Sequence, residues 1–97
     1  MAPVKVRWTD NAVADLEHAR DYIAASNPSE ALHVIGRIES ALKALRAYPE
    51  LGRIGRVERT RELVVPDTPF IIAYRTSLRS IEILAVIHGH RRWPANF

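Results

Sequence analysis

Cysteine is absent from this chain of 97 residues, and no apolar run approaches the roughly 18 residues needed to cross a bilayer. The missing thiols exclude disulfide bonds and thiolate metal sites, and they are consistent with a reducing compartment. From Met1 to Trp8 the chain alternates charged and apolar residues, so it lacks the continuous apolar block of a signal peptide. We therefore expect a cytoplasmic protein that does not associate with a membrane.

Lysine is missing from the second half of the chain. Residues 51–97 contain eight arginines and four acidic residues, a net charge of +4, whereas residues 1–50 have a net charge of −1. Arginine presents a planar fork that binds phosphate or carboxylate with two hydrogen bonds. Two interpretations of this arginine excess stay open. The arginines form a face that binds an acidic protein or a nucleic acid, or they reflect arginine-rich codon usage and are simply solvated.

The apolar content is sufficient for one hydrophobic core. Hydrophobic residues make up 47% of the sequence, and a chain of this length fits a single domain. No internal repeat or low-complexity tract divides it. We therefore treat residues 1–97 as one domain.

The first half of the chain predicts a strand followed by two helices. Val4–Trp8 alternates with period two, as a half-buried strand does. Thr9 can cap a helix over residues 10–25, and its apolar residues recur at helical spacing. Asn27 and the proline after it begin a second, longer helix over residues 28–47. The connection is so short that the two helices should form an antiparallel hairpin.

The second half predicts a loop and three strands. Residues 50–59 contain two glycines and three arginines and are expected to be a loop. Strands are expected over residues 60–65, 70–76 and 81–88, and the last is apolar on both faces, which is typical of a central strand. The predicted fold class is α+β with the order β-α-α-β-β-β. A three-stranded antiparallel C-terminal sheet should carry the helices on one face.

Four local patterns occur in this order along the chain. They are Trp8-Thr9 with Ala12 and Leu16; Pro49-Glu50-Leu51-Gly52-Arg53; Arg61-Glu62-Leu63 followed by Tyr74-Arg75; and Ile83-Leu84 leading to Ile87-His88-Gly89-His90-Arg91-Arg92-Trp93-Pro94. Together they resemble the RelE/ParE family of bacterial type II toxins. The resemblance implies a toxin that arrests growth and is neutralised by a cognate antitoxin, a DNA-binding protein of ribbon-helix-helix type.

The family resemblance implies two possible mechanisms. RelE-like members cut mRNA in the ribosome, and ParE-like members are associated with poisoning DNA gyrase. The ribonucleases often have an arginine three positions before the tyrosine matched by Tyr74, but Ile71 stands there in this chain. They also often end in tyrosine or histidine, whereas this chain ends Pro94-Ala95-Asn96-Phe97. The long helices resemble the ParE-like branch.

Strand alternation supports a protein that acts by binding. Arg75 shares a strand face with Ile71 and Ala73, so we expect an exposed sheet face with an apolar centre and an arginine rim. We therefore favour a ParE-like toxin. The alternatives are a metal-independent mRNA endoribonuclease of RelE type and a non-toxic module that only binds an antitoxin.

The candidate site residues follow from these hypotheses. The expected target-binding residues are Arg53, Arg56, Arg61, Arg75, His90, Arg91, Arg92 and Trp93. If the protein is a ribonuclease, the catalytic candidates are Arg61, Arg75, His88 and His90. The expected antitoxin-binding residues are Leu16, Ile23, Ile35 and Leu42.

Some of these residues have a structural interpretation as well. Trp93 could fold back and fill a gap beside the sheet instead of contacting a partner. His88 and His90 have a spacing compatible with a metal, but no third ligand lies near them in sequence. We expect no metal, no cofactor and no small-molecule substrate.

Overall fold

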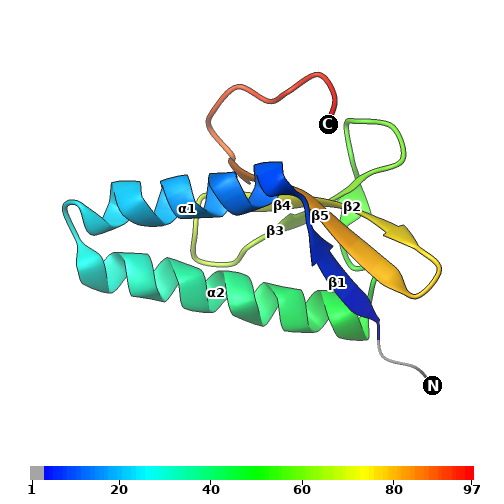
Figure 1. The fold of residues 1–97 in the computed structure, drawn as a ribbon, viewed down its shortest axis with the longest axis horizontal. Helices are drawn as coiled ribbons and strands as arrows, with labels where there is room; N and C mark the ends of the chain where they lie inside the picture. The colour runs from blue at the N-terminus through cyan, green and yellow to red at the C-terminus, as the bar shows by residue number, and fades with distance from the viewer. Residues whose placement is uncertain (1–3) are drawn as a thin grey trace.

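The computed structural model describes residues 4–97, and it places one sheet against two helices (Figure 1). Met1–Pro3 lie outside the described residues. They begin the N-terminal segment in which the sequence predicts no signal peptide. In chain order the elements are β1 (Lys5–Trp8), α1 (Asp10–Ala24), α2 (Pro28–Ala47), β2 (Arg53–Ile54), β3 (Arg61–Val64), β4 (Phe70–Ser77) and β5 (Ser80–His88). Neither described helix is long and apolar enough to span a bilayer.

The strands form one five-stranded sheet in the order β1-β5-β4-β3-β2. β1 pairs with β5 in parallel, and the other neighbours are antiparallel. The α+β class and the predicted order of the main elements are therefore confirmed, but the three-stranded sheet is wrong by two strands. The N-terminal strand joins the C-terminal ones, and the predicted loop contains β2, which pairs with β3 over two residues.

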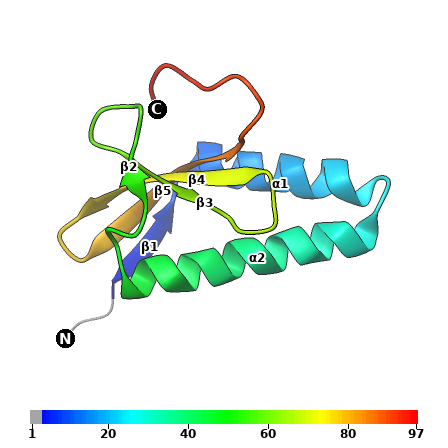
Figure 2. The ribbon, with the colours of Figure 1, turned by 180° about the vertical axis from the view of Figure 1, so that it is seen from behind.

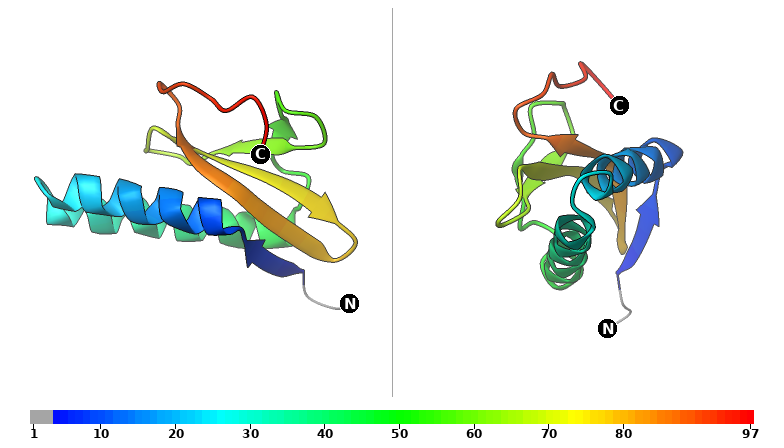
Figure 3. Two further views of the ribbon diagram at one scale, coloured as in Figure 1. Left: turned by 45° about the horizontal axis from the view of Figure 1, so that its top comes forward. Right: turned by 90° about the vertical axis from the view of Figure 1, so that its left-hand side faces the viewer.

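The helices begin where their capping residues predict. The Thr9 hydroxyl accepts the backbone N–H of Ala12 at 3.1 Å, and the Asn27 side chain accepts the N–H of Glu30 at 3.1 Å. The two helices run antiparallel on one side of the sheet (Figure 3). Between them and the sheet lies the main core. Its most deeply buried large side chains are Tyr74, Ile38, Leu45, Ile72, Ile81, Ile83 and Val65.

The opposite side of the sheet, which we call the outer face, has a smaller apolar cluster. Ala73, Ala85 and Ile87 form it, and Trp93 packs against them from the C-terminal tail, residues 89–97. The tail and the loop after β2 lie on the side of the sheet away from α2 (Figures 1 and 2). Trp93 thus takes the structural position that its sequence context allowed.

The centre of the outer face is apolar but not exposed. Ile71, the residue that replaces an expected phosphate clamp, retains 9% of its exposure, and Ala73 retains none. The alternation that placed both on the face away from the helices was correct, whereas their predicted exposure was wrong. The tail covers this part of the sheet, and strand alternation contains no information about that.

Candidate functional site

A buried carboxylate organises one end of the outer face. Glu62 pairs in register with Ala73, and its side chain keeps only 3% of its exposure. The Arg53 guanidinium donates to Oε1 at 3.0 and 3.2 Å. Arg56 donates its backbone N–H to Oε2 at 2.8 Å and its Nε to the same oxygen at 3.3 Å. Two of the predicted target-binding arginines are therefore held by one acidic residue.

The protonation of Glu62 reflects opposing effects. Burial alone would raise the pKa of this carboxyl, but the Arg56 backbone N–H and the two guanidinium groups lower the pKa below its usual value. Glu62 is therefore ionised at neutral pH. It fixes both arginines in place because each ion pair also carries directional hydrogen bonds.

Arg56 connects this cluster to the tail. Its guanidinium carbon lies 3.5 Å from the centre of the Trp93 ring, a cation–π geometry. Trp93 in turn packs on the Ala73, Ala85 and Ile87 cluster. The chain of contacts from Glu62 through Arg56 to Trp93 therefore holds the tail over the outer face.

Arg61 lies on the other side of the sheet. It pairs in register with Tyr74, whose ring is in the main core, and it donates to the carbonyl of Gly52 at 2.8 Å and of Glu50 at 3.3 Å. The Tyr74 hydroxyl accepts the Gly52 N–H at 2.8 Å and donates to the Pro49 carbonyl at 2.9 Å. Burial raises the pKa of Tyr74, so the hydroxyl stays protonated. These two side chains hold the segment between α2 and β2.

Arg75 and the two histidines lie at opposite ends of the β4–β5 pair. Arg75 is opposite Glu82 and forms an ion pair with it at 2.6 Å, whereas His88 is opposite Phe70. His88 lies six positions after Glu82 in β5, about 20 Å at roughly 3.3 Å per residue. Because Arg61 also lies on the other face, the four catalytic candidates do not converge on one point.

His88 serves the tail in the observed conformation. Its Nδ1 accepts the backbone N–H of His90 at 3.2 Å, and its carbonyl accepts the N–H of Arg91 at 3.0 Å. Burial, together with Arg91 and His90, lowers the pKa of His88 below its usual value. A neutral imidazole is needed to accept this hydrogen bond, so the geometry and the pKa direction agree.

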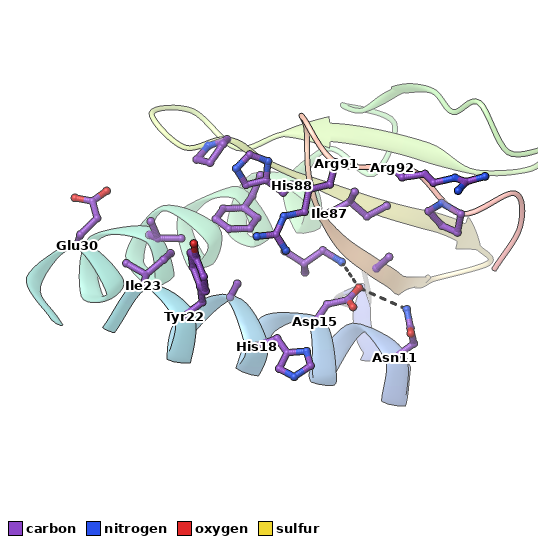
Figure 4. Close-up of a pocket in the computed structure, with 17 residues that line it drawn as sticks. Asn11, Asp15, His18, Tyr22, Ile23, Glu30, Ile87, His88, Arg91 and Arg92 are labelled. Carbon is purple, nitrogen blue, oxygen red and sulfur yellow. Dashed lines mark hydrogen bonds between the residues drawn. The ribbon is translucent and has the colours of Figure 1, made fainter. Parts of the chain in front are cut away.

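A groove of about 880 Å³ runs between α1, the end of β5 and the tail (Figure 4). Tyr22, which is 74% exposed, and Arg91 lie on two of its sides, with the Arg91 guanidinium 5.8 Å from the Tyr22 ring. Arg92 and His88 also line it, so its tail side is basic. The groove brings together two of the predicted target-binding residues that do not touch the Glu62 cluster.

The floor of the groove is an edge of the sheet that no strand covers. β1 ends at Trp8 opposite Ile83, so the last five residues of β5 have a strand neighbour only in β4. The Asp15 carboxylate accepts the N–H of Val86 at 3.0 Å (Figure 4). It takes the position that a carbonyl of a neighbouring strand would have. Burial raises the pKa of Asp15 despite this hydrogen bond. Side chains of α1 therefore cap the backbone of this edge.

The four expected antitoxin-binding residues have different positions. Leu16, Ile23 and Leu42 are partly buried and pack against the main core, and Ile35 is also partly buried. Only Ile23 lines the groove. Sequence reasoning missed Glu62, Asp15 and Tyr22 as site residues. The one available signal was Glu62, an acidic residue that precedes the apolar residues Leu63 and Val64 in the same strand.

Comparison with known proteins gives the family of this chain. The family model described as "ParE toxin of type II toxin-antitoxin system, parDE" matches residues 6–93. The chain belongs to the ParE toxin family. The resemblance to RelE/ParE toxins predicted from the four sequence patterns is therefore confirmed.

Two individual proteins and one solved structure are also similar to this chain. A Sinorhizobium fredii protein named Y4kP, described as a candidate toxin, is 46% identical over 94 residues, which is 97% of each chain. Toxin RelE2 of Caulobacter vibrioides is 34% identical over 87 residues, 90% of this chain and 97% of that protein. A structure of the chromosomal ParDE toxin–antitoxin system from P. aeruginosa aligns with a TM-score of 0.78 and 27% identity. The alignment covers 88% of this chain and 95% of that one.

For a ParE toxin, the arrangement divides the predicted arginine face into four parts. Arg53, Arg56 and Trp93 come together with Glu62, and Arg91 and Arg92 line the groove. Arg75 lies apart from both groups, and Arg61 lies on the helix side. The tail connects the two groups, because it contributes Trp93 to the outer face and Arg91 and Arg92 to the groove.

Proposed function

We propose that this ParE toxin acts in the cytoplasm by binding its target, with DNA gyrase as that target, and that a cognate antitoxin neutralises it. The observation that carries the proposal is the groove beside α1, which has a basic side and a floor of β5 with which no strand other than β4 pairs. The dispersal of Arg61, Arg75, His88 and His90 supports binding over catalysis. The antitoxin would be a DNA-binding protein of ribbon-helix-helix type.

The groove supports antitoxin binding on physical grounds. A segment bound in the groove is recognised chiefly through its side chains, because Asp15 already accepts the Val86 N–H and Asn11 already donates to the Leu84 carbonyl at this edge. The apolar lining from Phe70, Val86 and Ile23 suits apolar anchors, and Arg91 and Arg92 suit acidic ones. An acidic, partly apolar segment of the antitoxin is therefore the occupant that we propose.

An mRNA endoribonuclease is the second candidate. The observation in its favour is the 34% identity to a relative that carries the name RelE2. Inducing the protein alone, with transcript mapping and a gyrase supercoiling assay, separates the candidates. Filamentation with loss of supercoiling supports the gyrase proposal, and rapid translation arrest with cleaved transcripts contradicts it. Unchanged growth would favour a non-toxic module that only binds the antitoxin.

Replacing Tyr22 with alanine is expected to weaken antitoxin binding by roughly tenfold to a hundredfold, because exposed aromatic anchors carry much of the binding energy of an interface. Leu32→Ala is the matched control. Leu32 has 76% exposure against 74% for Tyr22, and it does not line the groove. Calorimetry with the antitoxin encoded beside the toxin measures both affinities. Equal affinities for the two variants would place the antitoxin elsewhere.

A further inference from the structure

The β4–β5 hairpin ends in a tip that folding alone does not explain. Ser77 and Ser80 pair in register, so the turn consists of Leu78 and Arg79. Leu78 is 94% exposed, the highest value for a large apolar residue in the described part of the chain. Arg79 has a φ of 62°, in the left-handed region that residues with a Cβ adopt reluctantly. Glycine or asparagine would suit this turn better.

Two hydrogen bonds brace the tip. The hydroxyls of Ser77 and Ser80 hydrogen-bond to each other across the turn. The backbone N–H of Lys5 donates to the Arg79 carbonyl at 3.0 Å, which ties the tip to β1. The exposed leucine therefore lies on a turn that is tied both across itself and to β1. Locally unfavourable conformations of this kind cluster at functional positions.

Cations surround the tip on the outer face. Lys5 and Arg7 are exposed and alternate with core-facing Val6 and Trp8, so they point to the outer face beside Arg75. Glu82 is the one carboxylate in this group, and it pairs with Arg75 at 2.6 Å. No ion pair within residues 4–97 uses Lys5, Arg7 or Arg79.

The chemistry of this surface matches a nucleic acid better than a protein. A stable protein interface buries about 800 Å² per partner around an apolar centre. Leu78 is the only large exposed hydrophobic on this hairpin, and hydroxyls and cations surround it. Interfaces with DNA are more polar and more positive, and apolar side chains on basic arms wedge between base steps in the minor groove.

We propose that the hairpin end, made of Lys5, Arg7, Arg75 and residues 77–80, binds double-stranded DNA. The three unpaired cations contact backbone phosphates, and Leu78 enters the minor groove. This goes beyond the proposed function and does not depend on it. The gyrase proposal is tested by the induction assay, whereas this one is tested by a titration with purified components.

The experiment titrates the full chain into a fluorescein-labelled 20-base-pair DNA duplex between 50 and 200 mM NaCl, with anisotropy as the readout. With three unpaired cations, the slope of log K against log salt should be about −3, and Kd should lie around 10⁻⁴–10⁻⁶ M. Arg7→Ala should reduce the slope by about 1. Glu82→Gln should tighten binding several-fold because it frees Arg75. Arg20→Ala, in α1 and paired with Asp21, should change nothing.

Variants of the turn separate a structural role from a binding role. Arg79→Gly should raise the melting temperature by roughly 2–6 °C, because glycine adopts the left-handed conformation readily, and should weaken DNA binding several-fold. Leu78→Ala should weaken binding without changing the salt slope. Any of three results would overturn the proposal: no binding at 50 mM NaCl, unchanged affinity in both Arg7→Ala and Arg79→Gly, or binding of single-stranded RNA at least as tight as that of the duplex.

Discussion

Gly52→Ala is expected to destabilise the domain by about 3 kcal/mol. A Cβ at this position would lie 2.6 Å from the Tyr74 hydroxyl, 2.7 Å from its ring and 2.9 Å from the Glu62 carbonyl. The ring is fully buried in the core and cannot move aside. The substitution therefore adds overpacking, about 1–3 kcal/mol, to the loss of the Gly52 N–H to Tyr74 hydrogen bond, about 1–3 kcal/mol.

Gly36→Ala is the matched control for this experiment. Gly36 lies inside α2, and nothing is within 4 Å of an added Cβ, so alanine should stabilise the helix by about 0.8–1 kcal/mol. Urea denaturation followed by circular dichroism measures both variants. Opposite signs are the expected result. A neutral Gly52→Ala would show that the segment from Pro49 to Gly52 moves freely, in conflict with its hydrogen bonds to Tyr74 and Arg61.

Glu62→Ala is expected to cost about 2 kcal/mol and to release the tail. Removing one partner of a buried ion pair is strongly destabilising, but Arg53 and Arg56 are each about half exposed and can be rehydrated, which reduces the cost. Arg56 then loses its fixed position over Trp93. In a Trp8→Phe background Trp93 is the single tryptophan, and its emission should shift to the red with easier quenching by iodide.

The pH dependence of the stability of Glu62→Ala adds a second readout. The pKa of Glu62 is lowered in the folded state, so its contribution to stability is complete above its ordinary pKa and is lost as pH falls through the folded value. The difference between wild type and Glu62→Ala should shrink below about pH 4. Glu82→Ala, which breaks a more exposed pair on the same face, should cost about 0–1 kcal/mol. Equal losses in the two variants would contradict the role assigned to Glu62.

Most of the fold could be predicted because its signals are local. Thr9 and Asn27 cap the helices where the sequence predicts, and the apolar period identifies both helices and the three long strands. β2 was missed because two residues carry no period. The parallel pairing of β1 with β5 was missed because it joins residues more than 70 positions apart, and no local pattern encodes it.

The site was predicted in its residue types more than in its arrangement. Arginines 53 and 56 and Trp93 do come together, yet Arg61 could not join them, because it is adjacent to Glu62 in the same strand and points to the other face. The groove depends on where β1 ends and where the tail folds back. Both are tertiary features, so the sequence did not predict the groove.

The pairing of β1 with β5 also sets the order in which this chain can fold during synthesis. The strand that β1 needs is not made until residue 80, and Thr9 must wait for the Ile83 carbonyl that accepts its N–H. At roughly 5–20 residues per second, a ribosome needs about 4–15 s to cover the distance between them. During that interval α1 and α2 lack the β5 strand of the sheet on which they pack. A nascent chain therefore cannot complete its core until β5 has been made.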